Sequence, residues 1–445
     1  MVEIIQKSRS FISFRTKQLI SNSFVQNVII VASGTAIAEV VKLAAAPVIT
    51  RLYGPEPFGI LSTFSAFVFM LAPLTALSYP ISIILPKDDS EALGLVGISF
   101  ISSLFVVSLI AAFLIIGGNH LVVLLNIPEI RSFLILIPIM LLTITGLETG
   151  RQWLFRTKHF NITSRFMVAQ ALLLNLSIII FGFIYANSST LIFLTVLANF
   201  IFAFLFIVQI RKYSGGLSIF ELRNPIHLFK LATNYYDFPI FRTPQRFINT
   251  TSQNLPVLML ASFFGPGAVA FYSLGRKVLV LPSMLIGDAL SKVFYPHITE
   301  VARENKSVTN SLIKTTAALA LLGIIPFGIV VVFGPPLFGL VFGSEWVKAG
   351  EYARWLAIWL YFAFLNRPCV AAIPVLSIQG FFLLYEIVGV VFRVVAIYIG
   401  FFVYSNDTIA ITLFSFVGAG LNIMLILYVF IISLRRNRVL IHLEK

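Results

Sequence analysis

Long apolar runs separated by short polar stretches dominate the chain, and most runs last about 20 residues. A helix needs about 20 apolar residues to cross the hydrocarbon core of a bilayer. The strands of a membrane barrel would instead alternate apolar and polar residues in segments of about ten. The pattern therefore predicts an all-α integral membrane protein.

About twelve membrane-spanning helices fit the pattern, within a range of eleven to fourteen. The expected bounds are 28–48, 57–85, 92–116, 133–147, 166–185, a sixth helix ending near 210, and then 239–264, 267–295, 312–333, 349–376, 381–404 and 409–434. A basic loop that contains Arg151, Arg156 and Arg165 is expected between the fourth and fifth helices.

The polar stretches divide the chain into two halves. The expected segments are a basic N-terminal segment (1–26), a first lobe of helices 1–6 (27–210), a linker (211–238), a second lobe of helices 7–12 (239–434) and a basic tail (435–445). Because each half has six helices, both halves enter the membrane from the same side. A pseudo-two-fold axis along the membrane normal should then relate the two six-helix lobes.

Two stretches, 50–91 and 261–300, share a sequence pattern. Each begins with aromatic-Gly-Pro, continues as an apolar helix with a proline partway along, and closes on Tyr-Pro. The matching motifs are Tyr53-Gly54-Pro55 with Phe264-Gly265-Pro266, Pro73 with Pro282, and Tyr79-Pro80 with Tyr295-Pro296. Weak internal repeats of this kind underlie many transporter folds. Pro73 and Pro282 are candidate hinges for alternating access, and the alternative is that they only shape static kinks.

Composition and charge agree with a membrane protein that has a fixed orientation. Of the 445 residues, 58% are hydrophobic and 11% are charged, whereas soluble domains carry about 25% charged residues. With a cytoplasmic N-terminus, about 23 of the 32 Lys and Arg residues fall on the inner side and about three on the outer side. Orientation therefore explains the net charge of +14 without nucleic acid. We expect a multi-pass protein of the cytoplasmic (inner) membrane, with both termini in the cytoplasm and no removable signal peptide.

Several charged residues fall inside the apolar runs, where each costs about 2.5–3.5 kcal/mol on insertion scales. Glu39 lies three residues before Lys42, so one interpretation is simple pairing on a helix face. We prefer a net cationic cavity for Lys42, Arg276 and Lys277, because these residues lie within or beside the repeated stretches. Such a cavity suits a phosphate or pyrophosphate. The candidate substrate contacts are Lys42, Arg51, Arg276, Lys277 and Arg367.

The sequence offers few candidate residues for ion coupling, metal binding or catalysis. Glu39 and Asp288 are candidate carboxylates for coupling to a proton or sodium gradient, although a pairing role is an alternative. The sequence contains no Gly-rich phosphate loop, and its histidines lack metal-ligand spacing. We therefore expect no metal, no cofactor and no catalytic residues. The single cysteine, Cys369, excludes an intrachain disulfide.

Two regions resemble a known family. The stretches SGTAIAEVVKLAAAPVITRLYGPEPFGILS and YYDFPIFRTPQRFINTTSQNLPVLMLASFFGPGAVAFYSLGRKVLVLPSMLIG are similar to bacterial polysaccharide exporters, the Wzx-type O-antigen flippases. These belong to the multidrug/oligosaccharidyl-lipid/polysaccharide exporter superfamily. The resemblance implies two six-helix lobes around a central cavity. It also implies transfer of undecaprenyl-pyrophosphate-linked oligosaccharide to the outer leaflet for O-antigen or capsule synthesis.

The resemblance also bears on residues and partners. Relatives usually carry a basic residue near the start of the eighth helix, and Lys277, before Val278 and Leu279, occupies that place. The connection between helices 10 and 11 is often basic in relatives, but here it reads Ser377-Ile378-Gln379-Gly380. The expected partners are the lipid-linked oligosaccharide and membrane lipids, with a polysaccharide polymerase and a chain-length regulator as further candidates.

Three other functions remain open. A peptidoglycan-precursor (lipid II) flippase has similar chemistry, although such proteins often carry two further helices. A drug-cation exporter would favour acidic groups in its cavity, whereas basic groups dominate here. A membrane polysaccharide polymerase or ligase would be expected to have larger, more polar outer loops than this sequence offers.

Overall fold

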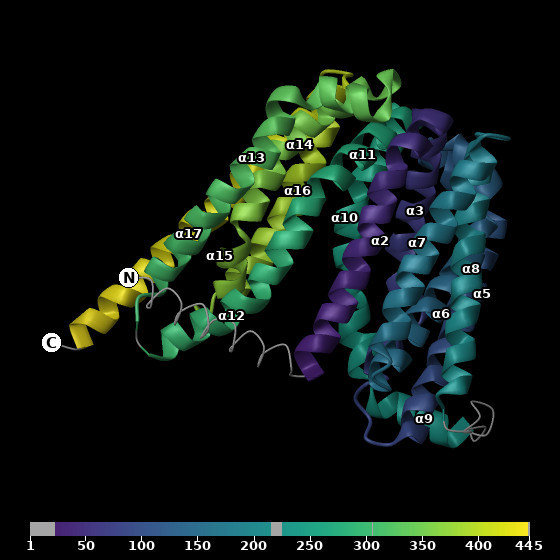
Figure 1. The fold of residues 1–445 in the computed structure, drawn as a ribbon, viewed down its shortest axis with the longest axis horizontal. Coiled ribbons are helices and arrows are strands. Elements are labelled where there is room, and N and C mark those ends of the chain that lie inside the picture. The colour runs from purple at the N-terminus through teal and green to yellow at the C-terminus, as the bar shows by residue number, and fades with distance from the viewer. Residues whose placement is uncertain (1–22, 215–224, 305, 444–445) are drawn as a thin grey trace, which may run out of the picture. The chain divides into compact units, whose positions relative to one another are not determined.

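The computed structural model describes residues 23–214, 225–304 and 306–443, and within these ranges every regular element is a helix (Figure 1). The side chains of residues 23–29, 225–227, 285–286, 288–293 and 437–443 are not described. Asp288, a candidate coupling residue, therefore begins a helix, but its side chain lies outside the description.

Nine helices among the described residues are long and apolar enough to cross a membrane. They are the described part of α2 (Ser23–Tyr53), α3 (Pro55–Thr75), α5 (Asp89–Leu124), α7 (Phe160–Gly182), α8 (Ser188–Lys212), α13 (Val308–Phe342), α14 (Val347–Leu365) continuing into α15 (Arg367–Ala372), α16 (Gln379–Phe402) and α17 (Asp407–Leu443). The other three predicted spans are also helical, but their sequences are more polar. These are α6 (Leu136–Arg156), α10 (Thr243–Phe264) and α11 (Pro266–Pro282). The predicted all-α membrane fold is confirmed.

The chain forms two compact units. Unit 1 contains residues 1–49, 67–121 and 131–251, and unit 2 contains residues 50–66, 122–130 and 252–445. Unit 2 thus includes two short segments from the first half of the sequence. The lobe boundaries drawn from the sequence remain predictions.

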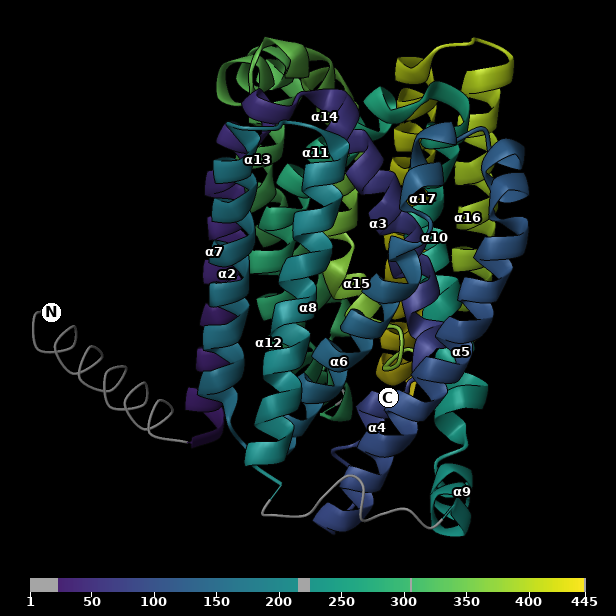
Figure 2. The same ribbon diagram turned by 90° about the vertical axis from the view of Figure 1, so that its right-hand side faces the viewer.

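Unit 1 is built around close packing of α6 on α8 (Figure 2). A Cβ atom added to Gly150 of α6 would lie 2.4 Å from the Cβ atom of Phe206, so only glycine permits this approach. Leu147, Leu154 and Phe202 complete the cluster around the contact. The tight core fixes the positions of the polar residues near the C-terminal end of α6.

In unit 2, α13 and α14 also approach each other closely at glycine residues. A Cβ atom added to Gly334 would lie 2.6 Å from the carbonyl oxygen of Gly350. The α13 helix continues through Pro335 and Pro336, where the sequence predicted an end at Phe333. A proline removes the N–H that would bond the carbonyl four residues earlier. Arg354 donates to that carbonyl at Val332, at 3.4 Å, which compensates the bond that Pro336 cannot make.

The repeated turns have the same geometry. Gly54 and Gly265 adopt left-handed φ angles of 67° and 79°. The N–H of each glycine donates to a carbonyl four residues earlier, Thr50 and Ala261 respectively, and both bonds are 3.1 Å long. The following proline in each case opens the next helix, where its missing N–H costs little. The weak sequence repeat is therefore a structural repeat at these turns.

The first of these two helices is interrupted after its proline, so the predicted continuous helix 57–85 was wrong, whereas the second stays helical through the predicted range 267–295 with a change of pitch after Pro282. After Pro73, the α3 helix ends at Thr75. Just beyond this end, Leu77 and Ser78 adopt left-handed φ angles of 50° and 58°. The short α4 (Tyr79–Ser82) follows this break. In the second copy, α11 ends at Pro282 and continues through a π-helical turn, η3 (Ser283–Gly287), into α12 (Asp288–Arg303). The hinge role of Pro73 and Pro282 remains a prediction.

Candidate functional site

The predicted pair on the first helix exists in unit 1. Lys42 Nζ lies 2.7 Å from Glu39 Oε1, and both side chains are partly exposed. Because the two residues are three positions apart on α2, they share one face of the helix. The positive charge of Lys42 is therefore balanced locally, which favours the pairing interpretation that the sequence left open.

A second polar cluster in unit 1 was not anticipated. Arg246, near the start of α10, forms an ion pair with Glu148 of α6, with Nη1 and Oε1 3.0 Å apart. Arg151 lies one turn from Glu148, and its buried Nε atom has no hydrogen-bond partner within the described part of the chain. Two guanidinium groups thus stand near one carboxylate, which leaves a net positive charge at the polar end of α6.

The sequence signal for this cluster was misread. We predicted that the fourth helix ends near Leu147 and that Arg151 and Arg156 lie in a basic loop, but α6 continues to Arg156. The spacing of Glu148 and Arg151, three residues apart, is the signal of a shared helix face that could have revealed the cluster. The partner, Arg246, comes from a distant helix and carries no local signature.

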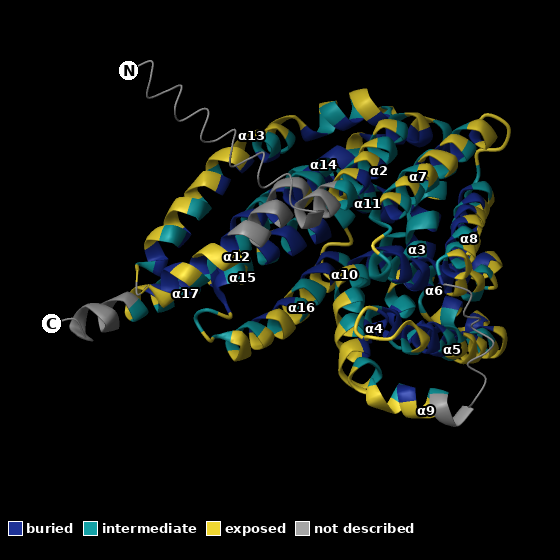
Figure 3. Cartoon of the chain, turned by 60° about the horizontal axis from the view of Figure 1, so that its bottom comes forward, coloured by how far each residue is buried: buried dark blue, intermediate teal, exposed yellow. Residues whose placement is uncertain are grey.

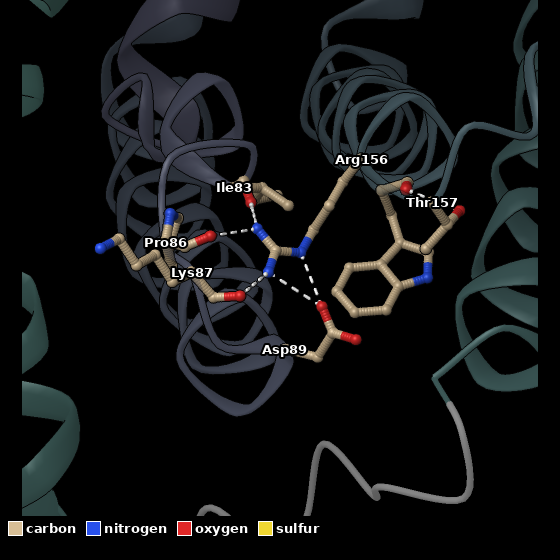
Figure 4. Close-up of polar contacts among 7 residues, drawn as sticks. Ile83, Pro86, Lys87, Asp89, Arg156 and Thr157 are labelled. Carbon is tan, nitrogen blue, oxygen red and sulfur yellow. Dashed lines mark hydrogen bonds and ion pairs between the residues drawn. The ribbon is translucent and has the colours of Figure 1, made fainter.

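Arg156 closes the same end of α6 (Figure 4). Its guanidinium group donates to the carbonyl oxygens of Ile83, Pro86 and Lys87 and to the carboxylate of Asp89. The Arg156 side chain is only 10% exposed, whereas Asp89 is 64% exposed. Arg156 therefore stabilises the turn between α4 and α5, and its bonds leave little capacity for a ligand.

In unit 2, the predicted basic pair lies on α11. Arg276 is half-buried and its Nη1 atom donates to the carbonyl oxygen of Gln253 on α10, at 3.0 Å. The neighbouring Lys277 is exposed. Arg276 thus fastens α11 to α10 through the backbone, and Lys277 is the more accessible of the two charges.

The other two predicted contacts in unit 2 also lie against the backbone. Arg51 is exposed and donates through Nη2 to the carbonyl oxygen of Leu340, near the end of α13. Arg367 opens α15, and its side chain packs against Gly287 of η3. Both positions are consistent with stabilisation of helix ends, and their roles as substrate contacts remain predictions.

One further cation of unit 2 lines a small hollow of about 20 Å³, roughly the room that one water molecule needs. Arg393 of α16 donates through Nε to Gly389 of its own helix, at 3.0 Å, and its guanidinium carbon lies 5.9 Å from the ring centre of Trp359. Pro256 and Phe414 form apolar walls of the hollow. The aromatic contact and the helix carbonyl partly compensate the cost of this charge at membrane depth.

The sequence of the chain decides its family. Residues 24–302, more than half of the chain, match the family described as "Polysaccharide biosynthesis protein". The chain belongs to this polysaccharide biosynthesis family. The match covers the first helices, the α6 cluster and the α11 basic pair.

Two curated proteins are similar to parts of this family member. The "Teichuronic acid biosynthesis protein TuaB" of Bacillus subtilis (strain 168) is 24% identical over 149 residues, which are 33% of this chain and 29% of that protein. The "Lipopolysaccharide biosynthesis protein WzxC" of Escherichia coli (strain K12) is 30% identical over 116 residues, 24% of this chain and 22% of that protein. The matched segments therefore span less than a third of either relative.

Solved structures share the fold across nearly the whole chain. "Lipid II flippase MurJ, inward closed conformation" has a TM-score of 0.68 at 13% identity, over 93% of this chain and 92% of that one. An inward-facing multidrug resistance MATE family transporter of the MOP superfamily has a TM-score of 0.64, also at 13% identity, over 92% and 95% of the two chains. These likenesses place the polysaccharide biosynthesis protein in a transporter fold.

Proposed function

We propose that this protein is a flippase that moves undecaprenyl-pyrophosphate-linked oligosaccharide repeat units across the cytoplasmic membrane for surface polysaccharide synthesis. The observation that carries the proposal is the family match over residues 24–302. The transporter fold supports translocation rather than an enzymatic step. Both termini lie in the cytoplasm, as the distribution of basic residues predicts.

The charge of the unit 1 cluster suits the diphosphate of this substrate. A guanidinium group binds a phosphate through two parallel hydrogen bonds. Arg246 already holds an oxyanion, the carboxylate of Glu148, through one contact of 3.0 Å between Nη1 and Oε1. An incoming phosphate can replace Glu148 at Arg246 and also bind Nε of Arg151, which has no hydrogen-bond partner among the described residues. In unit 2, Arg276 and Lys277 of α11 are the basic residues that the sequence predicts as substrate contacts.

Transport proceeds by alternating access, driven by a proton or sodium gradient. Glu39 and Asp288 are the candidate coupling carboxylates from the sequence, and Glu148 joins them because its partner Arg246 would be taken by the substrate. The helix break after Pro73 and the π-helical turn after Pro282 are the places where bending costs least, because the regular α-helical hydrogen-bond pattern is altered there.

A transport assay with purified protein in liposomes tests this function. A fluorescent undecaprenyl-diphosphate oligosaccharide should cross the bilayer faster than in protein-free liposomes. Arg246→Gln and the double change Arg276→Ala with Lys277→Ala should each slow transport about 10- to 100-fold, since hydrogen bonds to charged groups contribute about 1.5–3 kcal/mol. Arg435→Gln, an exposed basic residue at the end of the last span, serves as the matched control.

The same assay separates the alternatives. Transport of lipid II but not of the oligosaccharide substrate would identify a peptidoglycan-precursor flippase. Chain growth instead of translocation would identify a polymerase or ligase. Unchanged transport in the Arg246 variant, with its melting temperature also unchanged, would remove the α6 cluster from the site while leaving the function intact.

A further inference from the structure

The helix α9 (Pro225–Asn234) lies in unit 1, in the segment that joins α8 to α10. The preceding span, α8, ends at Lys212 and the following one, α10, begins at Thr243. Because α8 is long and apolar enough to cross the bilayer and the sequence predicts α10 as the next span, we expect α9 to lie close to the membrane surface. Figure 2 shows α9 beyond the end of the bundle, at the same end as α4.

One face of α9 is fixed to the protein. Leu228, Leu231 and Ala232 pack on the buried cluster that includes Ile83 and Trp153. The hydroxyl of Tyr79 donates to the carbonyl oxygen of Ala232, at 3.3 Å. The rotation of α9 about its axis is therefore set by contacts within unit 1.

Part of α9 is exposed (Figure 3), and the exposed residues are aromatic, basic and polar. Phe229 is 73% exposed, Lys230 and Thr233 are exposed, and Tyr236, just beyond the helix, is 51% exposed. Phe229, Thr233 and Tyr236 are spaced by four and three residues, so they follow one stripe of a helical path. An exposed aromatic residue flanked by lysine is unfavourable in water but typical of the boundary between lipid and water.

We propose that this face, defined by Phe229, Lys230, Thr233 and Tyr236, docks on anionic phospholipid headgroups. Phe229 and Tyr236 lie among the headgroups, and Lys230 binds phosphate. Arg242, exposed at the start of the next span, adds a second basic contact. Asp237 is the one acidic residue among positions 228–242, so this stretch keeps a net positive charge that attracts an anionic surface.

The geometry explains why a lipid is the occupant. The spans on both sides hold α9 at the membrane surface, so its free face meets headgroups continuously. The attraction between a basic residue and an anionic leaflet is about 1 kcal/mol for each Lys or Arg. Lys230 and Arg242 should therefore each change the preference for anionic lipid about fivefold, the ratio that corresponds to 1 kcal/mol.

A lipid-quenching experiment on the full-length protein tests the docking surface. Cys369 is the single cysteine, so Cys369→Ala with Thr233→Cys allows one fluorescent label on the free face. The labelled protein is reconstituted in phosphatidylcholine vesicles with or without phosphatidylglycerol, and either lipid is supplied with brominated chains near the headgroup. Quenching by brominated phosphatidylglycerol should exceed quenching by brominated phosphatidylcholine at equal amounts.

Three variants and one control variant test whether the quenching depends on this face. Lys230→Gln and Arg242→Gln should each lower the phosphatidylglycerol preference about fivefold, and Phe229→Ser should lower quenching by both lipids. Arg131→Gln, an exposed basic residue beyond the other end of α5, should leave the signal unchanged. Equal quenching by the two lipids that Lys230→Gln does not alter would overturn the proposal. A label shielded from both lipids would also overturn it, since another protein surface would then cover α9.

Discussion

Replacing Gly59 with alanine should disrupt the contact between the first turns of α3 and α11 in unit 2. A Cβ atom at Gly59 would lie 1.8 Å from the carbonyl oxygen of Pro266 and 2.5 Å from its carbonyl carbon. Real Cβ contacts essentially never fall below 3.0 Å. Because the obstructing atoms belong to the backbone, no side-chain rotation relieves the clash, and one helix must move away from the other.

The size of the effect follows from what must move. Overpacking of a well-packed interior costs about 1–3 kcal/mol, and we expect about 3 kcal/mol here because a helix backbone is displaced. Neighbouring interactions are exposed to the same displacement. Phe58 lies edge-on to Trp346, with ring centres 5.5 Å apart, and Trp346 Nε1 donates to the carbonyl oxygen of Thr50, at 3.1 Å.

The assay uses the buried thiol of Cys369, which lies in the same unit. A thiol-reactive dye added during heating reports the temperature at which unit 2 opens. The matched control is Gly267→Ala on α11, where an added Cβ has nothing within 4 Å. We expect a clear loss of stability for Gly59→Ala and almost none for the control. Equal melting of the two variants would refute the packing argument.

Three further predictions test other parts of the structure. Arg156→Ala should destabilise unit 1 by about 2–3 kcal/mol, because three carbonyl groups lose a charged donor, and Arg156→Lys should destabilise it less. Tryptophan fluorescence on heating measures the melting temperatures of both variants. Equal melting temperatures for the Ala variant, the Lys variant and the wild type would contradict the prediction. Asn187→Ala should cost about 1 kcal/mol, because Asn187 Oδ1 caps α8 by accepting from the Thr190 N–H at 2.8 Å, whereas Ser189→Ala should be neutral in the same measurement. Cys369 should resist maleimide in the native protein and react only after unfolding, since its side chain is fully buried; rapid native labelling, followed by mass spectrometry, would show that the packing around α15 is wrong.

The order and type of the helices could be predicted because they depend on local patterns. Apolar runs of spanning length mark the helices whether or not their partners are known, and the aromatic-Gly-Pro motifs marked both turns. The ends of helices were harder to predict. The α6 helix continues past Leu147 because Glu148 and Arg156 find partners in Arg246 and the α4–α5 turn. Those partners are far away in the sequence, so the polar residues looked like a loop.

The roles of the candidate site residues were harder to predict from the sequence than the ends of the helices. Composition revealed that basic groups lie at membrane depth, but it could not distinguish a ligand contact from a bond to the backbone. Arg51, Arg276 and Arg354 each donate to a carbonyl oxygen of another helix. Every residue has a backbone carbonyl that can accept a hydrogen bond, so no sequence motif predicts which of them an arginine will donate to.

The two Gly-Pro turns have a consequence for biosynthesis. Gly54 and Gly265 reverse the chain within a few residues, and a proline opens the returning helix in each case. Almost no hydrophilic connection then has to be carried across the bilayer between the paired helices. Each helix–turn–helix hairpin can leave the translocation machinery as one preassembled unit, and lengthening either turn with charged residues should slow its integration.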